Sequence, residues 1–275
     1  MVKHIILWQL KDEFTPEEKA KIKAGIKEGL EGLVGQVPGL LRVKVYVEGA
    51  DPSMVMLDSY LASAEALKGY ATHPAHVAVA NAKVRPYTQA RHCLDFEGDS
   101  EFSELVWERR SFRKFKADLP AKELVDEVVR AGLLAPTGRN KQSSVVLRID
   151  DPELREEIRA KNAEIMGAPP PGRPADPFYA APVMLLVIAN KANNTGVYDG
   201  SLTMGNMMLK AHELGLAACW IHRAKEELES PRGQKILAKA GLEGEWEGVG
   251  HLALGYADMP LPEPHPYNAA RYITI

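Results

Sequence analysis

The sequence has few of the features that mark disulfide-stabilised or membrane-spanning proteins. Its 275 residues include only two cysteines, Cys93 and Cys219, too few for a disulfide framework or a cysteine-based metal cage. We expect both thiols to be reduced and buried, and we expect no bound metal. No apolar run approaches the roughly 20 residues of a membrane-spanning helix, and no secretory leader is recognisable. The cytoplasm is the expected location.

An excess of charge of one sign is also missing. Lys and Arg number 34 against 37 Asp and Glu, which gives a net charge of -3, and the basic residues are spread along the chain. This balance gives no reason to expect nucleic acid or an anionic membrane as a partner. No Gly-x-Gly-x-x-Gly turn is present, so the sequence lacks the fingerprint of a dinucleotide bound on a Rossmann fold. With 45% apolar residues, a globular chain of one large or two ordinary domains is expected.

The first hundred residues show the pattern of a small α+β unit. Thr15-Pro16-Glu17-Glu18 is a strong helix start, because threonine caps, proline opens the first turn and glutamate completes a capping box. The order strand, helix, strand, strand, helix, strand is ferredoxin-like, and one helix layer leaves the other sheet face open for a second copy. The predicted strands are Val2–Leu10, Leu41–Glu48, Ser53–Leu61 and Tyr87–Phe96, and the second helix is 63–84, interrupted at His73-Pro74.

A short basic segment, Glu108 to Phe115, follows this unit. It contains Arg109, Arg110, Arg113 and Ser111, with phenylalanine as its only apolar residue type. Arginine matches the geometry of a phosphate and holds it bidentately, and a serine hydroxyl can add a hydrogen bond. The segment therefore suggests a phosphate-bearing ligand, although a short basic run is also typical of a solvated surface.

A polar loop lies one helix further along the chain. An amphipathic helix is predicted over Asp118–Leu134, and Pro136 and Gly138 end it. The loop that follows offers hydroxyl and amide groups, and a strand is predicted directly after it. Its candidate binding residues are Thr137, Asn140 and Gln142.

Together these two motifs resemble the nitroreductase family of flavin enzymes. That family opens with Arg-Arg-Ser-x-Arg-x-Phe, continues with a helix and then carries Ala-Pro-Ser/Thr-x-x-Asn-x-Gln. The resemblance implies bound FMN, with Arg109 and Ser111 facing the phosphate and ribityl chain and Arg110 assisting. It places Arg113 near the pyrimidine side of the flavin, where a cation stabilises the charge of reduction. It gives the ring edge to Thr137, Asn140 and Gln142.

The C-terminal part of the chain carries further family features. Trp220, Ile221 and His222 stand where the family has a strand end against the flavin, although His222 is equally explained as a surface residue that caps the next helix. The family usually continues with a Lys or Arg among prolines that reaches the FMN phosphate. This sequence has none there, so His265 or Arg271 would have to serve.

The first unit resembles the stress-responsive A/B barrel family of dimeric α+β barrels. The matching stretches are 2–8 and 70–77. Some members of that family cyclise polyketides, which assigns a possible cavity site to His4, Tyr70 and His76. Histidine can act as a general base near neutral pH and tyrosine can polarise a carbonyl. The alternative is that these residues only shape the cavity and the helix break.

The polar link Gly98-Asp99-Ser100-Glu101 gives the predicted domains, a barrel over 1–98 and a nitroreductase-like FMN domain over 99–275, both α+β. The expected function is reduction of small acceptors, such as nitroaromatics or quinones, by NADH or NADPH. A homodimer with FMN at its interface is the expected assembly. Two alternatives stay open, namely ligand binding or cyclisation in the barrel, and a non-catalytic stress protein.

Overall fold

The computed structural model describes residues 1–98, 101–169, 171–172 and 174–275. The described chain forms two compact units, Met1–Glu104 and Leu105–Ile275. Two residues of the predicted link, Asp99 and Ser100, lie outside the described residues, and so do Pro170 and Arg173. No helix within the described part of the chain is both long enough and apolar enough to cross a membrane.

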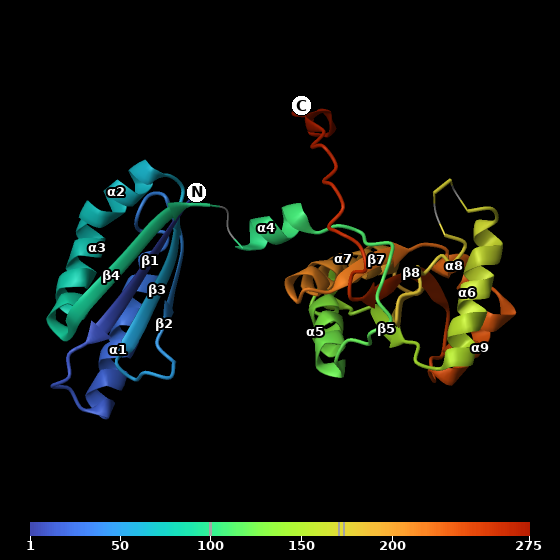
Figure 1. The fold of residues 1–275 in the computed structure, drawn as a ribbon, viewed down its shortest axis with the longest axis horizontal. Coiled ribbons are helices and arrows are strands. Elements are labelled where there is room, and N and C mark those ends of the chain that lie inside the picture. The colour runs from blue at the N-terminus through green and yellow to red at the C-terminus, as the bar shows by residue number, and fades with distance from the viewer. Residues whose placement is uncertain (99–100, 170, 173) are drawn as a thin grey trace. The chain divides into compact units, whose positions relative to one another are not determined.

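The first unit is a four-stranded antiparallel sheet with helices on one face (Figure 1). The sheet has the order β2-β3-β1-β4, which confirms the ferredoxin-like prediction. Its elements are β1 Val2–Leu10, α1 Pro16–Glu31, β2 Leu40–Tyr46, β3 Met54–Leu61, α2 Ala64–Thr72, α3 Pro74–Val79 and β4 Thr88–Glu97, with a π-helix at Ala80–Val84 and a 3-10 turn at Arg85–Tyr87 before β4.

Sequence signals explain where these elements begin and which way they face. Thr15 caps α1, and a full capping box with Glu18 is present. Alternate residues of β1 are buried under the helices, among them Ile6 and Trp8. The opposite face of the sheet mixes polar and apolar residues, and Leu7, Leu94 and Phe96 are exposed on it. The predicted helix 63–84 is divided at His73, because Pro74 starts a new helix.

The second unit is an antiparallel sheet of order β5-β6-β8-β7 between two helical layers (Figure 1). The strands are β5 Ser144–Arg148, β6 Val183–Asn190, β7 Ala217–Ile221 and β8 Trp246–Gly255. Helix α4 Glu101–Glu108 spans the division between the units. The helices of the second unit are α5 Lys122–Leu133, α6 Pro152–Met166, α7 Gly196–Glu213, α8 Ala224–Leu228 and α9 Pro231–Lys239, with 3-10 turns at Gly138–Asn140 and Ala269–Arg271.

Two apolar cores lie on the two faces of this second sheet. One core packs α5 and α7 against the sheet and contains Met204 and Met207, which are fully buried. The other packs α6, α8 and α9 on the opposite face, around Phe178 and Ile236. The continuous apolar run 182–188 of the sequence predicts a buried central strand, and the structure confirms it, because Val183 to Ala189 of β6 are buried without interruption.

Some sequence expectations needed correction. Helix α5 begins at Lys122 rather than Asp118, because Pro120 and the extended residue Ala121 precede it. The sequence predicts a helix over 199–214, whereas α7 already begins at Gly196. Cys219 is buried as expected, but Cys93 is exposed, because it lies on the edge strand β4.

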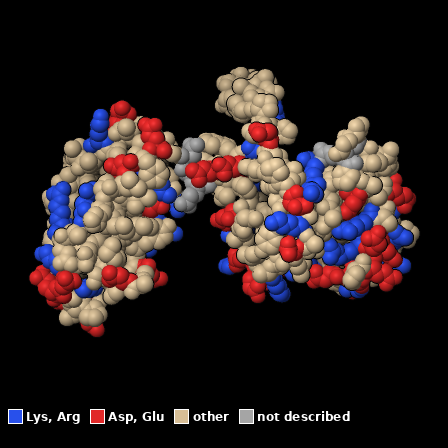
Figure 2. Space-filling view, in the orientation of Figure 1, with Lys and Arg blue, Asp and Glu red and all other residues tan. Residues whose placement is uncertain are grey.

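Lys and Arg are interspersed with Asp and Glu on the face shown in Figure 2.

Candidate functional site

The basic segment that follows α4 lies along the free edge of β7. The backbone N–H of Phe112 donates to the carbonyl of Ala218 in β7 at 3.1 Å. Phe115 forms an isolated bridge with Ala257, just beyond β8. Both phenylalanine rings are buried in the core beside the sheet. These anchors fix the backbone and leave the polar side chains of the segment at the surface.

A pocket of about 700 Å³ opens beside this segment. Its volume falls within the range of sites that bind small molecules and cofactors. The predicted residues Arg109, Arg110, Ser111 and Arg113 all line it, together with Trp107 of α4 and the C-terminal stretch that contains Pro262, Glu263, His265 and Tyr267.

The arginines of the pocket differ in how they are engaged. Arg110 donates to the carbonyls of Trp107 at 2.5 Å and Arg109 at 3.0 Å, and its buried Nε has no hydrogen-bond partner among the described groups. Arg113 donates to the Ser111 carbonyl at 3.3 Å. The guanidinium of Arg109 makes no hydrogen bond or ion pair with any described residue. Arg110 therefore stabilises the backbone of the turn, and the guanidinium of Arg109 is able to bind an anion.

The pocket is positive before any ligand binds. His212, in the last turn of α7, has a pKa below its ordinary value, mainly because burial disfavours the imidazolium. Glu108 opposes this shift, whereas Arg109 and Arg110 lower the pKa of His212 further. The described lining carries three arginines against one carboxylate, Glu263, so its net charge is positive, as an anion-binding site requires.

The polar loop between α5 and β5 has an unusual backbone. Arg139, Asn140 and Gln142 all have positive φ, at 54°, 55° and 49°. Such conformations cost about 1–3 kcal/mol each for residues other than glycine and persist only where neighbouring contacts fix them. One such contact is local, since Thr137 Oγ1 accepts from the Gln142 N–H at 3.0 Å.

The main anchor of this loop is Asp199, a buried residue of α7. Its carboxylate accepts from the Gly138 N–H at 3.0 Å, the Ser143 hydroxyl at 2.5 Å and the Thr195 hydroxyl at 3.2 Å. Burial acts to raise the pKa of Asp199, but these hydrogen bonds outweigh it and hold the pKa below its usual value. Asp199 stays charged, and its hydrogen bonds to Gly138 and Ser143 hold both ends of the loop in place.

The turn after β7 contains the remaining predicted residues. Trp220 packs over Gly250 of β8, where an added Cβ would lie 2.2 Å from the indole nitrogen. Ile221 is buried in the core, and His222 is exposed. The suggestion that His222 caps the next helix is wrong: the N-cap of α8 is Arg223, which is left-handed with φ 79° and makes no side-chain cap.

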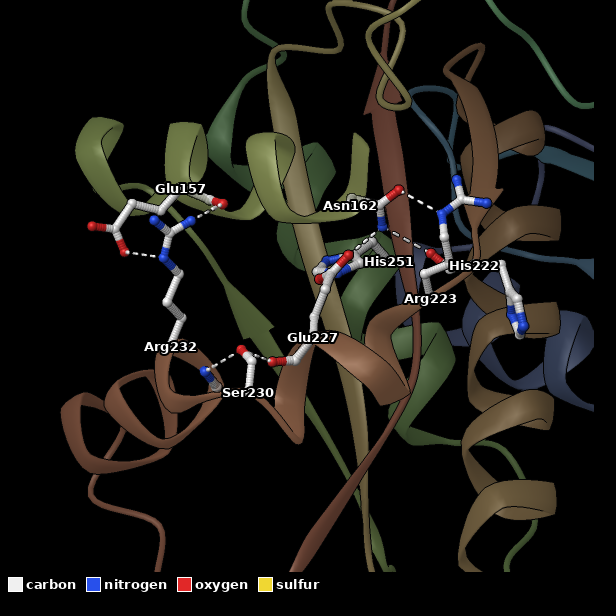
Figure 3. A network of polar contacts seen from close by, with 9 residues as sticks. Glu157, Asn162, His222, Arg223, Glu227, Ser230, Arg232 and His251 are labelled. Atoms are coloured by element: carbon white, nitrogen blue, oxygen red, sulfur yellow. Dashed lines mark hydrogen bonds and ion pairs between the residues drawn. The ribbon is translucent and has the colours of Figure 1, made fainter. Parts of the chain in front are cut away.

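A buried polar network supports this turn (Figure 3). Asn162 of α6 donates to the His222 carbonyl at 2.9 Å and to the carboxylate of Glu227, and it accepts from Arg223 Nε at 2.9 Å. Glu227 in turn contacts Nε2 of His251, fully buried in β8, at 2.5 Å. The network ties α6, α8 and β8 to the backbone of one turn, which it holds in a fixed shape.

Within one chain the predicted residues therefore fall into three groups. The four residues of the basic segment share the pocket with His265, whereas Arg271 lies on an exposed 3-10 turn and does not line it. The loop residues Thr137, Asn140 and Gln142 and the turn residues Trp220, Ile221 and His222 do not line that pocket either. Sequence reasoning missed the supporting residues Asp199, Asn162, Glu227 and His251, for which no local motif exists.

The first unit encloses a separate cavity of about 370 Å³. His4, Tyr70 and His76 all line it, with Arg85 and Arg91. The ring centroids of Tyr70 and His76 are 4.2 Å apart, and those of His4 and Tyr70 are 5.9 Å apart. The structure thus brings together the three residues that the sequence singled out.

The ionisation of these cavity residues follows from their burial. Burial raises the pKa of Tyr70 to about 12, against a smaller opposing effect of Arg91. Burial also lowers the pKa of His76, despite its contact with the Ala71 carbonyl. The Tyr70 hydroxyl is buried and has no hydrogen-bond partner in the described structure. The cavity therefore presents a neutral phenol donor and a histidine base.

Comparison with known proteins agrees with the arrangement of both units. Residues 106–256 match the model of the nitroreductase family, and residues 2–98 match that of the stress responsive A/B barrel domain. The chain belongs to the nitroreductase family, with an A/B barrel domain at its N-terminus. A search of curated proteins gave no match.

Several solved structures share the fold of the second unit. A nitroreductase with bound FMN from Bacteroides fragilis is 22% identical, with a TM-score of 0.56 over 64% of this chain and 99% of its own. One with bound FMN from Desulfitobacterium hafniense is 23% identical, with a TM-score of 0.57 over 65% and 99%. An FMN-dependent nitroreductase from Clostridium difficile is 21% identical, with a TM-score of 0.57 over 65% and 100%. At these identities the likeness shows the fold.

Proposed function

We propose that this protein is an FMN-dependent oxidoreductase in which NADH or NADPH reduces a small acceptor such as a nitroaromatic or a quinone. The observation that carries the proposal is the pocket of the basic segment, where Arg109 has no partner among the described residues and Ser111 lies alongside it. Membership of the nitroreductase family and the FMN held by structures of the same fold support the choice of cofactor.

The residues of the pocket fit FMN. Arg109 and Ser111 would hold the phosphate and ribityl chain, and Arg110, fixed by its backbone contacts, would shape the turn. His265 lines the pocket and Arg271 does not, which supports His265 as the further phosphate contact. Arg113 would stabilise negative charge on the ring. Bound FMN would supply the transfer of hydride or electrons, and the protein supplies binding, orientation and charge.

We further propose that two copies of the chain complete each site. Helix α7 exposes Val197, Tyr198 and Leu202, and the C-terminal stretch that projects in Figure 1 exposes Tyr267, Tyr272 and Ile273. Exposed apolar side chains on two segments of one unit are typical of an obligate interface. The loop of Asn140 and the turn of His222 would then meet FMN held by the pocket of the partner copy. The proposal also includes two domains, 1–98 and 99–275, and a cytoplasmic location.

The test is the visible absorption spectrum of the purified full-length protein, before and after addition of FMN and then of NADH or NADPH without oxygen. Flavin bands that bleach on addition of the nicotinamide are the expected result. Arg109→Ala should lose the flavin, whereas Arg130→Ala, on the exposed face of α5, should keep it. A protein that takes up no FMN would contradict the proposal and favour a non-catalytic stress protein.

A second function is favoured by the cavity of the first unit. An enclosed space that presents Tyr70 and His76 could bind, or cyclise, a small carbonyl-containing molecule. The two functions separate cleanly by mutation. A ligand of the cavity should be lost in His76→Ala and kept in Arg109→Ala, and FMN should show the reverse.

A further inference from the structure

Strands β1 and β4 of the first unit bring three potential metal ligands together. Asp95 is the cross-strand partner of His4, and Cys93 is the partner of Ile6, two residues further along β1. Side chains of directly paired residues lie on the same face of a sheet, and so do residues two apart on one strand. The sequence places His4 far from the other two residues, and the antiparallel pairing of β1 with β4 makes them neighbours.

The ligand atoms have the spacing of a tetrahedral site. Cys93 Sγ lies 3.5 Å from Asp95 Oδ1 and 3.7 Å from His4 Nδ1. Zinc bonds of about 2.0–2.3 Å at tetrahedral angles place neighbouring ligand atoms roughly 3.3–3.6 Å apart. The third distance, between His4 Nδ1 and Asp95 Oδ1, is 2.5 Å and corresponds to a hydrogen bond that a metal would replace. The half-exposed Asp95 side chain can make that small movement.

We propose that His4, Cys93 and Asp95 form a binding site for zinc or a closely similar divalent cation. The combination of imidazole, thiolate and carboxylate suits zinc, and a site with three protein ligands leaves a fourth position for water or another ligand. Among the described residues, this is the cluster of His, Cys and acidic side chains whose geometry could hold a metal. The site lies in the first unit and does not depend on the proposed FMN chemistry.

Proton balance and charge are consistent with this assignment. When zinc binds His4 Nδ1, the proton of that nitrogen moves to Nε2 of the same ring. Zinc also displaces the proton of the Cys93 thiol, so one proton is released for each ion bound. The ligand set then carries two negative charges against the two positive charges of the ion. His4 also lines the barrel cavity, which places the ion beside that cavity.

The test uses the full-length protein, freed of metal, equilibrated with zinc and separated from excess ion by gel filtration. One zinc per chain is expected, and its X-ray absorption spectrum should show one sulfur neighbour at about 2.3 Å with nitrogen and oxygen neighbours at about 2.0–2.2 Å. Cys93→Ser and Asp95→Asn carry the mutational test, because both residues are exposed and their replacement leaves the core intact.

Removal of a residue that only hydrogen-bonds to a metal ligand lowers metal affinity roughly 10- to 100-fold. Each of these two variants removes a ligand itself and should lower zinc affinity by more than that. His92→Ala is the matched control, because His92 directly precedes Cys93 on β4 but faces the other side of the sheet, and this variant should bind zinc like the parent. The absence of bound zinc, an absorption spectrum without sulfur, or unchanged affinity in Cys93→Ser would overturn the proposal. The FMN absorbance of all three variants serves as the separate check on the second unit.

Discussion

The two cavities of this chain are built in opposite ways. The barrel cavity is enclosed by one sheet and its own helices, and its central groups, Tyr70 and His4, are buried within a single chain. The pocket of the basic segment is open and larger, and its far wall is the exposed C-terminal stretch that contains Tyr267. Every lining residue of the barrel cavity belongs to the first unit of one chain, whereas we propose that the pocket of the basic segment gains further walls when two copies associate.

The largest expected effect comes from removal of that far wall. Deletion of residues 261–275 takes away every lining residue from Pro262 to Tyr267. We expect FMN affinity to fall at least about 100-fold, equivalent to roughly 2.7 kcal/mol, in an equilibrium titration of flavin fluorescence. Deletion of residues 272–275 alone spares the lining residues and should retain binding. Equal affinity in the longer deletion would show that the basic segment suffices.

The next effect concerns Arg109 of the same pocket, whose guanidinium has no partner among the described residues. Arg109→Ala removes a charge-assisted contact to phosphate and should weaken FMN binding by about 1.5–3 kcal/mol, or roughly 10- to 150-fold. Arg109→Lys should recover only part of the loss, because lysine lacks the planar fork. The same titration measures both variants. Full recovery by lysine would indicate a role of charge alone, without bidentate geometry.

A smaller effect, dependent on pH, is expected at Asp199. The pKa of Asp199 is lower in the folded protein than in the unfolded chain, so its ionised form stabilises the fold. This stabilisation is fully present above the unfolded-state pKa of about 3.9 and is lost as the pH falls through the folded-state pKa. Asp199→Asn should lower the free energy of unfolding by about 1–2 kcal/mol at pH 7, and the deficit should shrink near pH 3. Urea denaturation at both pH values measures it. Asp126→Asn, on the surface of α5, should change stability by less than about 0.5 kcal/mol at either pH.

The smallest effect is predicted in the enclosed cavity. Because the Tyr70 hydroxyl is buried without a partner in the described structure, Tyr70→Phe should leave the free energy of unfolding within about 1 kcal/mol of the parent, neutral or slightly more stable. Phenolate absorbance of Tyr70 should appear only near pH 12 in the parent. A clear destabilisation by Tyr70→Phe would mean that the hydroxyl already serves the fold.

The sequence predicted the elements better than the support of the site. Local signals such as the capping box at Thr15 and the uninterrupted apolar run of β6 depend on neighbouring residues, so they can be read directly and were confirmed. Asp199 acts on a loop some sixty residues before it, and no short motif reveals such a contact. The exposure of Cys93 was mispredicted for a related reason, because strand order decides which strand lies at an edge.

Asn162 imposes a joint constraint on the evolution of the turn after β7. Its amide donates to the His222 carbonyl and to Glu227 while its oxygen accepts from Arg223. Aspartate would lose both donors and set a second carboxylate against Glu227, and leucine of similar size would remove all three of these hydrogen bonds. A change at position 162 is tolerable only with matched changes at 223 and 227. These three positions are therefore expected to be inherited together or replaced together.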